Sequence, residues 1–434
     1  MSKLKIRQFK PANYVSPILS HIKLPHGKKL QFAMDKDELP VNVIKDGRIH
    51  KDNDISFEIA GARKNVFFKP EKTRVAIVTC GGLCPGLNDV IRGIVVSLFY
   101  WYDVKDIVGI KYGYSGLAAS PKYKPVALDP ELVSAIHEEG GSFLGTSRGN
   151  PPVEEMVDSI IKMKVNILFC IGGDGTLRGA HMISEEIQKR KLQISVIGVP
   201  KTIDNDICYV QRSFGFHTAI EEAKKVLNCA HVEAKGADNS IGLVKLMGRD
   251  AGYIAANATK ASGNVNYCLI PEIKFPLYEP GGLLDTLKER FSYKNHAVIA
   301  IAEGAGIHLI GKGERKDAGG NTIHNDIGIF LKDEIKKFFE SLGIRINIKY
   351  FDPSYIIRSV PASGDDSIFC ADLARFAVHA GMAGKTDMLI GNSNGLFTHV
   401  PLSAIHGRKK QIDIFGERLW GTVVATTGQP TDWH

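Results

Sequence analysis

The feature that most constrains the fold is an alternation, from Arg74 onward, of short apolar runs with longer amphipathic segments. The runs are rich in Val and Ile and cover residues 75–79, 166–171, 194–199, 241–246, 267–270, 297–302, 344–350 and 388–390. Helical patterns lie between them, for example over residues 177–191, 218–230 and 367–383. Strands that alternate with helices form parallel βαβ units, so the pattern predicts an α/β fold. Runs that are apolar throughout indicate strands covered by helices on both faces.

Nearly all of these runs are followed by Gly, Pro or Asp. In sheets of this kind, ligands bind at the carboxyl ends of the strands. The turns that follow the runs are therefore the places where we expect the functional residues.

The charge distribution argues against a nucleic-acid partner. Residues 1–75 hold 16 Lys and Arg against 8 Asp and Glu, which accounts for the whole net charge of +8. These basic residues are interleaved with acidic ones and form no long block. The first 70 residues show no strong period, and we expect an accessory extension with a few strands and a role in subunit contacts.

Other sequence features predict a cytoplasmic protein. No window approaches 18 consecutive apolar residues, so we expect no membrane span. The N-terminal residues MSKLKIRQF lack the apolar core of a secretory signal. The seven Cys are an odd number without a repeated spacing, which favours reduced thiols.

The turn after the first run reads CGGLCPGLN over residues 80–88 and leads into a predicted helix over residues 89–100. Paired glycines let a backbone approach a phosphate, and a helix N-terminus offers free N–H groups. An ordinary tight strand–helix turn is the alternative interpretation of this segment.

A second turn, CIGGDGTLRG over residues 170–179, places one carboxylate, Asp174, among three glycines. A lone acidic residue in a bare phosphate site would repel its ligand. With Mg²⁺ the arrangement makes sense, because this ion takes one or two carboxylates together with phosphate oxygens. We therefore predict a phosphate site with Mg²⁺ on Asp174, the alternative being a helix cap.

Two further turns bring carboxylates and a guanidinium to strand ends. In PKTIDND, over residues 200–206, Asp204 and Asp206 stand beside Thr202 and Lys201. One of these carboxylates can take the proton of an attacking hydroxyl, although Asp also clusters in ordinary turns. In MGRDAG, over residues 247–252, Arg249 can stabilise the charge of a transferring phosphoryl group, or form a surface ion pair.

Taken together, these turns resemble those of the 6-phosphofructokinases. The strings GGxxPGxN, GGDGT, PKTIDND, MGRDAG and AEG occur in order between about residues 74 and 402. NAD kinases and lipid kinases of the diacylglycerol kinase type carry strings similar to GGDGT, but are not expected to have the TIDND and MGR turns. The resemblance implies that ATP phosphorylates the C1 hydroxyl of fructose 6-phosphate, giving fructose 1,6-bisphosphate and ADP in glycolysis.

Three alternatives stay open at this point. The closest is a pyrophosphate-dependent phosphofructokinase of the same fold. A NAD-kinase-like or lipid-kinase-like enzyme is a remote one. The third is a regulatory subunit without activity, which should have lost a carboxylate, yet Asp174, Asp204 and Asp206 are all present.

The resemblance also implies an architecture. We expect two Rossmann-like three-layer lobes with parallel-rich sheets, an active site between them, and the N-terminal extension at residues 1–70. The nucleotide-binding lobe should cover residues 71–215 with a return segment at about 357–405. The sugar-phosphate-binding lobe should cover residues 216–356 with a C-terminal segment at about 406–434.

The resemblance assigns site residues as well. The nucleotide would be bound, with Mg²⁺ on Asp174, by Gly82, Arg148, Gly173, Asp174, Gly175 and Thr176. The sugar phosphate would be bound by Thr202, Ile203, Asp204, Met247, Gly248, Arg249, Glu303, Tyr355, Ile356, Ile357 and Arg358. Asp204 would be the general base on the C1 hydroxyl, with Arg249 and Lys201 as the other catalytic residues.

Two positions bear on the phosphoryl donor. ATP-using members of the family have Gly after the GGD aspartate, as Gly175 does here, whereas pyrophosphate users have Asp. Pyrophosphate users have Lys before TIDND, as Lys201 does here, whereas the well-known bacterial ATP enzymes have Gly. This mixture resembles an ATP-using subgroup that includes the enzymes of trypanosomatid parasites, and we expect ATP to be the donor.

Two other positions bear on the subunit arrangement. The bacterial ATP enzymes have an Arg at the positions of Ser240 and Lys349, and each of these Arg side chains reaches the sugar phosphate of a neighbouring subunit. Lys349 keeps the charge but loses the bidentate geometry. The resemblance implies an allosteric homotetramer or homodimer, and these substitutions leave open how its subunits share the site.

Overall fold

In the computed structural model, residues 2–18, 30–42, 55–120, 122–311, 325–431 and 433 are described. Residues 1, 19–29 and 43–54 of the predicted extension lie outside them. The chain divides into two compact units. Unit 1 comprises Met1–Thr202, Ile207–Gly215 and Ser359–Arg408, and unit 2 comprises Ile203–Asp206, Phe216–Arg358 and Lys409–His434. No helix in the described part is both long and apolar enough to cross a membrane.

Unit 1 is built on a large mixed sheet with the strand order β1-β5-β18-β17-β11-β10-β7-β8-β9, with β4 added on β5. Its strands are β1 (Ser2–Lys3), β4 (Glu38–Pro40), β5 (Ile55–Ile59), β7 (Arg74–Thr79), β8 (Asp106–Ile110), β9 (Val126–Ala127), β10 (Ile167–Gly172), β11 (Ser195–Pro200), β17 (Met388–Ser393) and β18 (Leu396–Pro401). Two small ribbons pair β3 (Tyr14–Val15) with β6 (Asn65–Val66) and β2 (Arg7–Gln8) with β16 (Lys385–Thr386).

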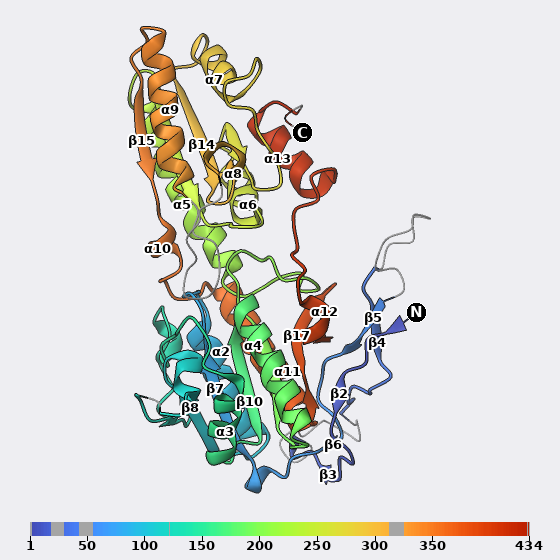
Figure 1. Ribbon diagram of the computed structural model, residues 1–434. Coiled ribbons are helices and arrows are strands. Elements are labelled where there is room, and N and C mark those ends of the chain that lie inside the picture. The colour runs from blue at the N-terminus through green and yellow to red at the C-terminus, as the bar shows by residue number, and fades with distance from the viewer. Residues whose placement is uncertain are drawn as a thin grey trace. The chain divides into compact units, whose positions relative to one another are not determined.

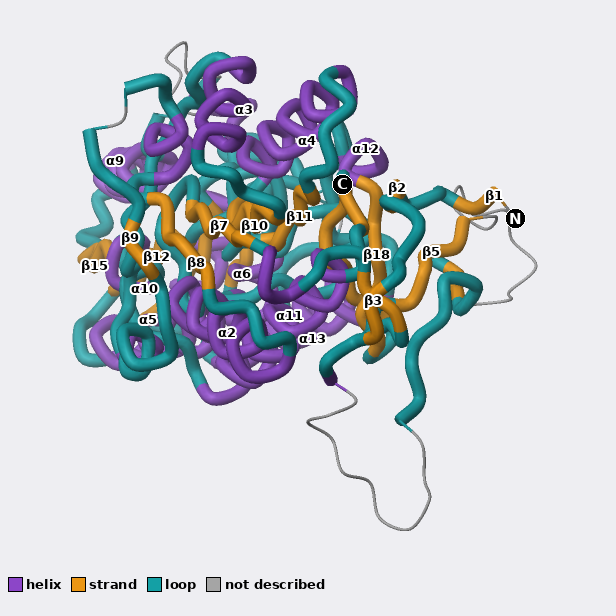
Figure 2. Tube along the Cα trace, turned by 90° about the horizontal axis from the view of Figure 1, so that it is seen from below, coloured by secondary structure: helices purple, strands orange, loops and turns teal. Residues whose placement is uncertain are grey.

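The central strands β8, β7, β10, β11 and β17 run parallel, and β7, β10 and β11 are almost completely buried. Helices cover both faces, with α3 and α4 on one and α2 and α11 on the other, as Figure 2 shows. The helices of unit 1 are α2 (Leu87–Trp101), α3 (Val153–Lys162), α4 (Asp174–Lys189), α11 (Gly364–Met382) and α12 (Leu402–Ile405), with short turns η1 (Pro70–Lys72), η2 (Gly113–Leu117) and η3 (Ile136–Glu138). The predicted three-layer arrangement is thus confirmed for this unit.

Unit 2 has a smaller parallel sheet of order β13-β14-β12-β15. Its strands are β12 (Ser240–Leu246), β13 (Tyr267–Leu269), β14 (His296–Ala302) and β15 (Asn347–Phe351). Its helices are α5 (Phe216–Lys235), α6 (Tyr253–Ser262), α7 (Leu283–Phe291), α8 (Ile307–Ile310), α9 (Ile327–Ser341), α10 (Ser354–Ile357) and α13 (Thr422–Thr427), with the π-helical turn η4 (Glu417–Gly421). The helices α5 and α6 pack on each other, and α9 lies along β15 (Figure 1).

The N-terminal residues join unit 1 through a buried charge network. Strand β5 pairs antiparallel with β18, which places Glu58 opposite His399. Lys385 donates to Glu58 at 2.8 Å, and Arg63 also pairs with this carboxylate. All four side chains are at most 7% exposed, so the extension is fixed to the lobe by charges that water does not screen.

Candidate active site

The predicted donor-binding turns lie at one edge of the sheet of unit 1. Strands β7 and β10 are parallel neighbours with Ile171 in register with Thr79. The carboxyl ends of both strands therefore meet, and so do the glycine-rich turns that follow them. The N–H of Gly81 donates to Ser147 O at 2.9 Å, which brings the turn of Gly82 beside that of Arg148.

Four residues predicted to bind phosphate lie at the N-terminus of α4. Gly173 precedes the helix and Asp174 is its first residue. A Cβ on Gly175 would meet no atom within 4 Å, so this position faces open space. Thr176 is 5% exposed, and its carbonyl accepts from the hydroxyl of Tyr114 at 2.8 Å. The fully formed turn thus presents Asp174 and the backbone of Gly175 at the N-terminus of a 16-residue helix.

Lys201 follows β11 and is 6% exposed. Its main-chain N–H donates to Gly172 O at 3.0 Å, and its ammonium group donates to Gly82 O at 2.5 Å. The lysine therefore connects both glycine-rich turns. Thr202, the next residue, accepts a bond of 2.5 Å on its carbonyl from the hydroxyl of Ser213.

The predicted acceptor-side residues gather in unit 2. The N–H of Glu303 donates to Leu246 O at 2.8 Å, and the N–H of Gly304 donates to Gly248 O at 3.0 Å. These bonds align the turn after β14 with the turn after β12. A Cβ at position 304 would overlap the carbonyl of Arg249, so the close approach of the two turns requires glycine there.

Asp204 belongs to this group. The main-chain N–H of Arg249 donates to its carboxylate, and Asp206 and Glu303 stand near it. Asp204 keeps some exposed surface as a residue, but its Oδ1 is shielded from solvent. Burial, together with the charges of Asp206 and Glu303, raises the pKa of Asp204 to about 8, although Arg249 opposes this shift. The structure therefore places beside Arg249 a carboxylate that can gain and lose a proton near neutral pH.

The remaining acceptor-side residues differ in exposure. Tyr355 and Ile356 on α10 are 73% and 67% exposed, whereas the side chain of Ile357 is buried in the core of unit 2. The guanidinium of Arg358 lies 4.4 Å from the ring centroid of Tyr355. Met247 is 6% exposed, and Ile203 packs against the same core. Ile357 can thus contact a ligand only through its main chain.

Ser240 and Lys349 lie away from the carboxyl ends of their strands. Ser240 is the first residue of β12, fully buried, and Leu246 is the last. At about 3.3 Å per residue, roughly 20 Å separates Ser240 from the turn of Arg249. Lys349 sits in the middle of the neighbouring strand β15, in register with Gly242.

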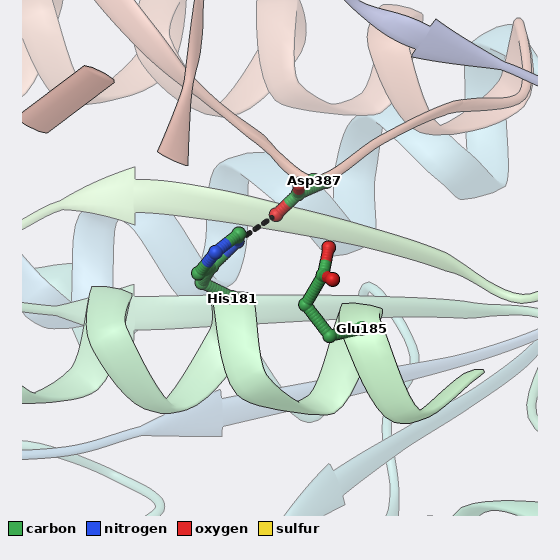
Figure 3. A group of neighbouring side chains, drawn as sticks. All are labelled: His181, Glu185 and Asp387. Atoms are coloured by element: carbon green, nitrogen blue, oxygen red, sulfur yellow. Dashed lines mark hydrogen bonds and ion pairs between the residues drawn. The ribbon is translucent and has the colours of Figure 1, made fainter. Parts of the chain in front are cut away.

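The donor chemistry of Asp174 fits Mg²⁺, because a carboxylate oxygen is a hard ligand of the kind this ion takes. Another cluster of possible ligands occurs in unit 1. Among the described residues, His181, Glu185 and Asp387 form the only group of three such side chains close together (Figure 3). Arg7 pairs with Glu185 at 2.6 Å and with Asp387 at 3.4 Å, so a guanidinium already supplies the positive charge. We interpret this cluster as an attachment of β2 to α4.

The sequence patterns did not indicate that residues 409–412 contact the candidate site. Lys409 pairs with Asp206 at 2.7 Å and with Asp250 at 3.6 Å. The only sequence signal was the basic string RKK at residues 408–410, which is ordinary on a protein surface.

The chain is similar to known proteins of one family. A family model described as phosphofructokinase matches residues 74–381. The chain is 45% identical over 407 residues to the ATP-dependent 6-phosphofructokinase of Borreliella burgdorferi, covering 92% of this chain and 91% of that protein. It is 46% identical over 382 residues to the ATP-dependent 6-phosphofructokinase of Entamoeba histolytica, covering 87% and 86%.

Among solved structures, the chain resembles a pyrophosphate-dependent phosphofructokinase from Marinobacter aquaeolei. The TM-score is 0.66 at 19% identity, and the match covers 79% of this chain and 86% of that one. At this identity, the match shows that the two chains share a fold. The use of pyrophosphate belongs to the Marinobacter protein and is not transferred to this chain.

Proposed function

This chain belongs to the phosphofructokinase family, and we propose that it transfers the γ-phosphoryl group of ATP to the C1 hydroxyl of fructose 6-phosphate. It is an ATP-dependent 6-phosphofructokinase, a kinase of glycolysis that produces fructose 1,6-bisphosphate and ADP. The observation in the structure that supports this function best is the position of Asp204, a carboxylate of raised pKa held by the Arg249 N–H at the acceptor-side turns.

In the mechanism we propose, the residues of unit 1 bind the donor. The backbone N–H groups of Gly82 and of residues 173–176 bind phosphate oxygens, and Arg148 adds a positive charge. Asp174 would hold Mg²⁺, which when bound neutralises charge on the donor phosphates. Lys201, already directed at Gly82 O, exchanges that carbonyl for a donor phosphate oxygen.

The residues of unit 2, with Thr202, bind and activate the acceptor. Fructose 6-phosphate is held by residues 247–249, Glu303 and residues 355–358. Asp204 accepts the proton of the C1 hydroxyl as that oxygen attacks the γ-phosphorus in line, and the bond to ADP breaks. Arg249 and Lys201 stabilise the negative charge that develops on the transferring group.

The oligomeric state, the regulation and the cellular compartment are also part of the proposal. We propose a homo-oligomer, a homotetramer or a homodimer, under allosteric control, working in the cytoplasm. Two of the plant relatives are named chloroplastic, so the family is not confined to one compartment.

The test is a coupled assay with fructose 6-phosphate and Mg²⁺, run in parallel with ATP and with pyrophosphate. We expect rapid turnover with ATP and very little with pyrophosphate. A loss of activity in Asp204→Asn, measured in the same assay, would show that the activity belongs to this site. Turnover with pyrophosphate as fast as with ATP would overturn the donor assignment.

A further inference from the structure

Residues 409–412, which we call the strap, contact the acceptor-side turns of unit 2 from a distant part of the chain. The ammonium group of Lys409 lies 2.7 Å from Oδ2 of Asp206 and 3.6 Å from Oδ2 of Asp250. Asp206 comes two residues after Asp204, and Asp250 directly follows Arg249. One side chain therefore connects the turn that carries the proposed base with the turn that carries the proposed arginine.

The rest of the strap is bonded to the same turns. Its further hydrogen bonds are Lys410 N–H to Asp206 O at 2.9 Å, Gln411 Nε2 to Asp250 O at 3.1 Å, Tyr253 hydroxyl to Gln411 O at 2.6 Å, and Ile412 N–H to Glu272 at 3.0 Å. The same Glu272 carboxylate accepts from the N–H of Gly252 at 3.1 Å. The strap is thus fixed to both turns by side-chain and main-chain bonds.

The segment that follows holds the strap in place. Trp420 is 3% exposed and Val423 is fully buried in the core of unit 2, where α13 packs on α6. Farther on, Gln429 accepts from the N–H of Cys268 at 2.7 Å. Because the chain beyond the strap is anchored in the core, Lys409 has a defined position over the turns.

The burial of Asp206 makes its pairing with Lys409 important. Asp206 is 7% exposed, whereas the side chain of Lys409 is 35% exposed. A buried carboxylate that loses its partner keeps its desolvation cost and tends to rearrange toward other groups. Asp206 lies near Asp204, whose carboxylate also accepts from the Arg249 N–H and lies near Glu303, so such a rearrangement would displace the reacting groups.

We infer that Lys409 is a positioning residue for phosphoryl transfer, acting through Asp206 and Asp250 to hold Asp204 and Arg249 in their reactive geometry. This inference rests on the proposed function, since it assumes that Asp204 and Arg249 act on the transferring group. Lys409 itself need not touch either substrate.

The test compares Lys409→Met and Lys409→Arg with the wild-type protein under saturating ATP, fructose 6-phosphate and Mg²⁺. Displacement of reacting groups by about 1 Å costs up to roughly 100-fold, so we expect Lys409→Met to lower kcat by about 10- to 100-fold. The KM for ATP should change by less than about twofold, because the donor is bound by other residues. Lys409→Arg should recover most of kcat, and Lys224→Met, which removes an exposed lysine of α5, should behave as wild type.

A double-mutant cycle tests whether Lys409 acts through Asp206. If it does, Lys409→Met combined with Asp206→Asn should be little worse than Asp206→Asn alone. Independent, multiplying effects of the two substitutions would contradict the inference. So would a wild-type kcat in folded Lys409→Met, or a loss of kcat that Lys409→Arg fails to recover.

Two further controls distinguish a folding defect of the variant from a failure of the inference and from a failure of the proposed function. Circular dichroism and thermal unfolding report whether Lys409→Met folds. If it does not fold, Lys409→Gln replaces it, and a wild-type kcat there overturns the inference. An inactive wild-type protein would instead count against the proposed function, and binding of ATP to that protein would show that the donor side is intact.

Discussion

The ammonium group of Lys201 donates a hydrogen bond of 2.5 Å to the main-chain oxygen of Gly82. Lys201 is the residue that resembles the pyrophosphate-using enzymes, yet in this chain it is directed at a glycine-rich turn of the donor side. A lysine in that place can pair with whichever phosphoryl group is transferring. We therefore expect Gly175, and not Lys201, to decide which donor is used.

The first prediction concerns Gly175. A Cβ at this position meets no atom within 4 Å, so Gly175→Asp should fold normally. The new carboxylate would fill and charge the space that the α-phosphate of ATP requires. We expect kcat/KM for ATP to fall by at least about 100-fold, equivalent to about 2.7 kcal/mol. Steady-state kinetics with ATP and with pyrophosphate measure both donors.

Two matched variants separate size from charge. Gly175→Ala adds only a methyl group and should keep most of the ATP activity, while gaining about 0.4–1 kcal/mol of stability from the reduced freedom of the unfolded chain. Gly175→Asn has nearly the size of Asp without its charge and should fall between the two. Any pyrophosphate activity gained by Gly175→Asp should require Lys201. ATP kinetics that are unchanged in Gly175→Asp would show that Lys201 is the better guide to the donor.

The parts of the site that the sequence predicted are those that depend on strand ends. Because β7, β10 and β11 are parallel neighbours, the motifs that follow them had to meet at one edge of the sheet, and Gly82, Asp174 and Lys201 do. The runs at residues 75–79 and 388–390 lie within β7 and β17. The run at residues 344–350 begins too early, because α9 is followed by the left-handed Gly343 and β15 starts only at Asn347.

What the sequence could not predict are contacts between residues far apart in the chain. Lys409 lies 203 positions from Asp206, and neither residue carries a pattern that indicates the other. The pKa of Asp204 likewise depends on Glu303, which a turn after a different strand brings close. The pairing of Glu58 with Lys385 could not be predicted either, because the weak periodicity of the extension does not indicate where its side chains lie.

The second prediction concerns Asp204. Asp204→Asn should lower kcat by roughly 10²–10⁴ and leave the KM values largely intact, because the amide cannot accept the C1 proton. In the wild-type protein, kcat/KM should fall as the pH drops below about 8, since the base is then increasingly protonated. A pH profile of kcat/KM checks this, and near-normal turnover in folded Asp204→Asn would refute the assignment.

The same substitution should stabilise the protein at high pH. The pKa of Asp204 is higher in the folded state than its ordinary value of 3.8, so this carboxyl favours folding at low pH, and that contribution is lost as the pH rises through about 8. At pH 9, Asp204→Asn should unfold a few degrees above the wild type, whereas at pH 5 the difference should be smaller. Thermal unfolding without ligands measures both. An equal difference at the two pH values would mean that the charge on Asp204 does not destabilise the fold.

The third prediction concerns the metal. Asp174→Ala removes the carboxylate that opens α4, so it should raise the Mg²⁺ concentration needed for half-maximal activity and lower the rate with ATP. Glu185→Ala is the matched control, because Glu185 lies farther along the same helix and pairs with Arg7. We expect Mg²⁺ titrations of Glu185→Ala to follow the wild type. If Asp174→Ala did so too, another residue must hold the ion.

The fourth prediction concerns the attachment of the N-terminal extension. Burial alone would raise the pKa of Glu58, but His399 and Lys385 together lower it to about 2. A carboxyl whose folded pKa is depressed contributes stability above its unfolded pKa of about 4.5, and that contribution is lost as the pH falls toward 2. Burial also lowers the pKa of His399, so protonation of this histidine in the unfolded chain weakens the attachment in the same direction.

Strand β5 should therefore detach in acid before the rest of unit 1 unfolds. The protection factors of the amides of Ile55–Ile59 should fall as the pH drops from about 6.5 toward 2, while those of β10 stay high. At pH 7, Glu58→Gln should expose β5 by itself, because it leaves the buried Lys385 with only the partly exposed carboxylate of Asp35, a loss of up to about 3–5 kcal/mol. In that variant the further loss of protection below about pH 4.5 should be smaller than in the wild type, since the Glu58 carboxylate that titrates there is gone and only the effect of His399 is left. A variant whose exchange responds to acid as steeply as the wild type would show that other carboxylates hold the extension in place.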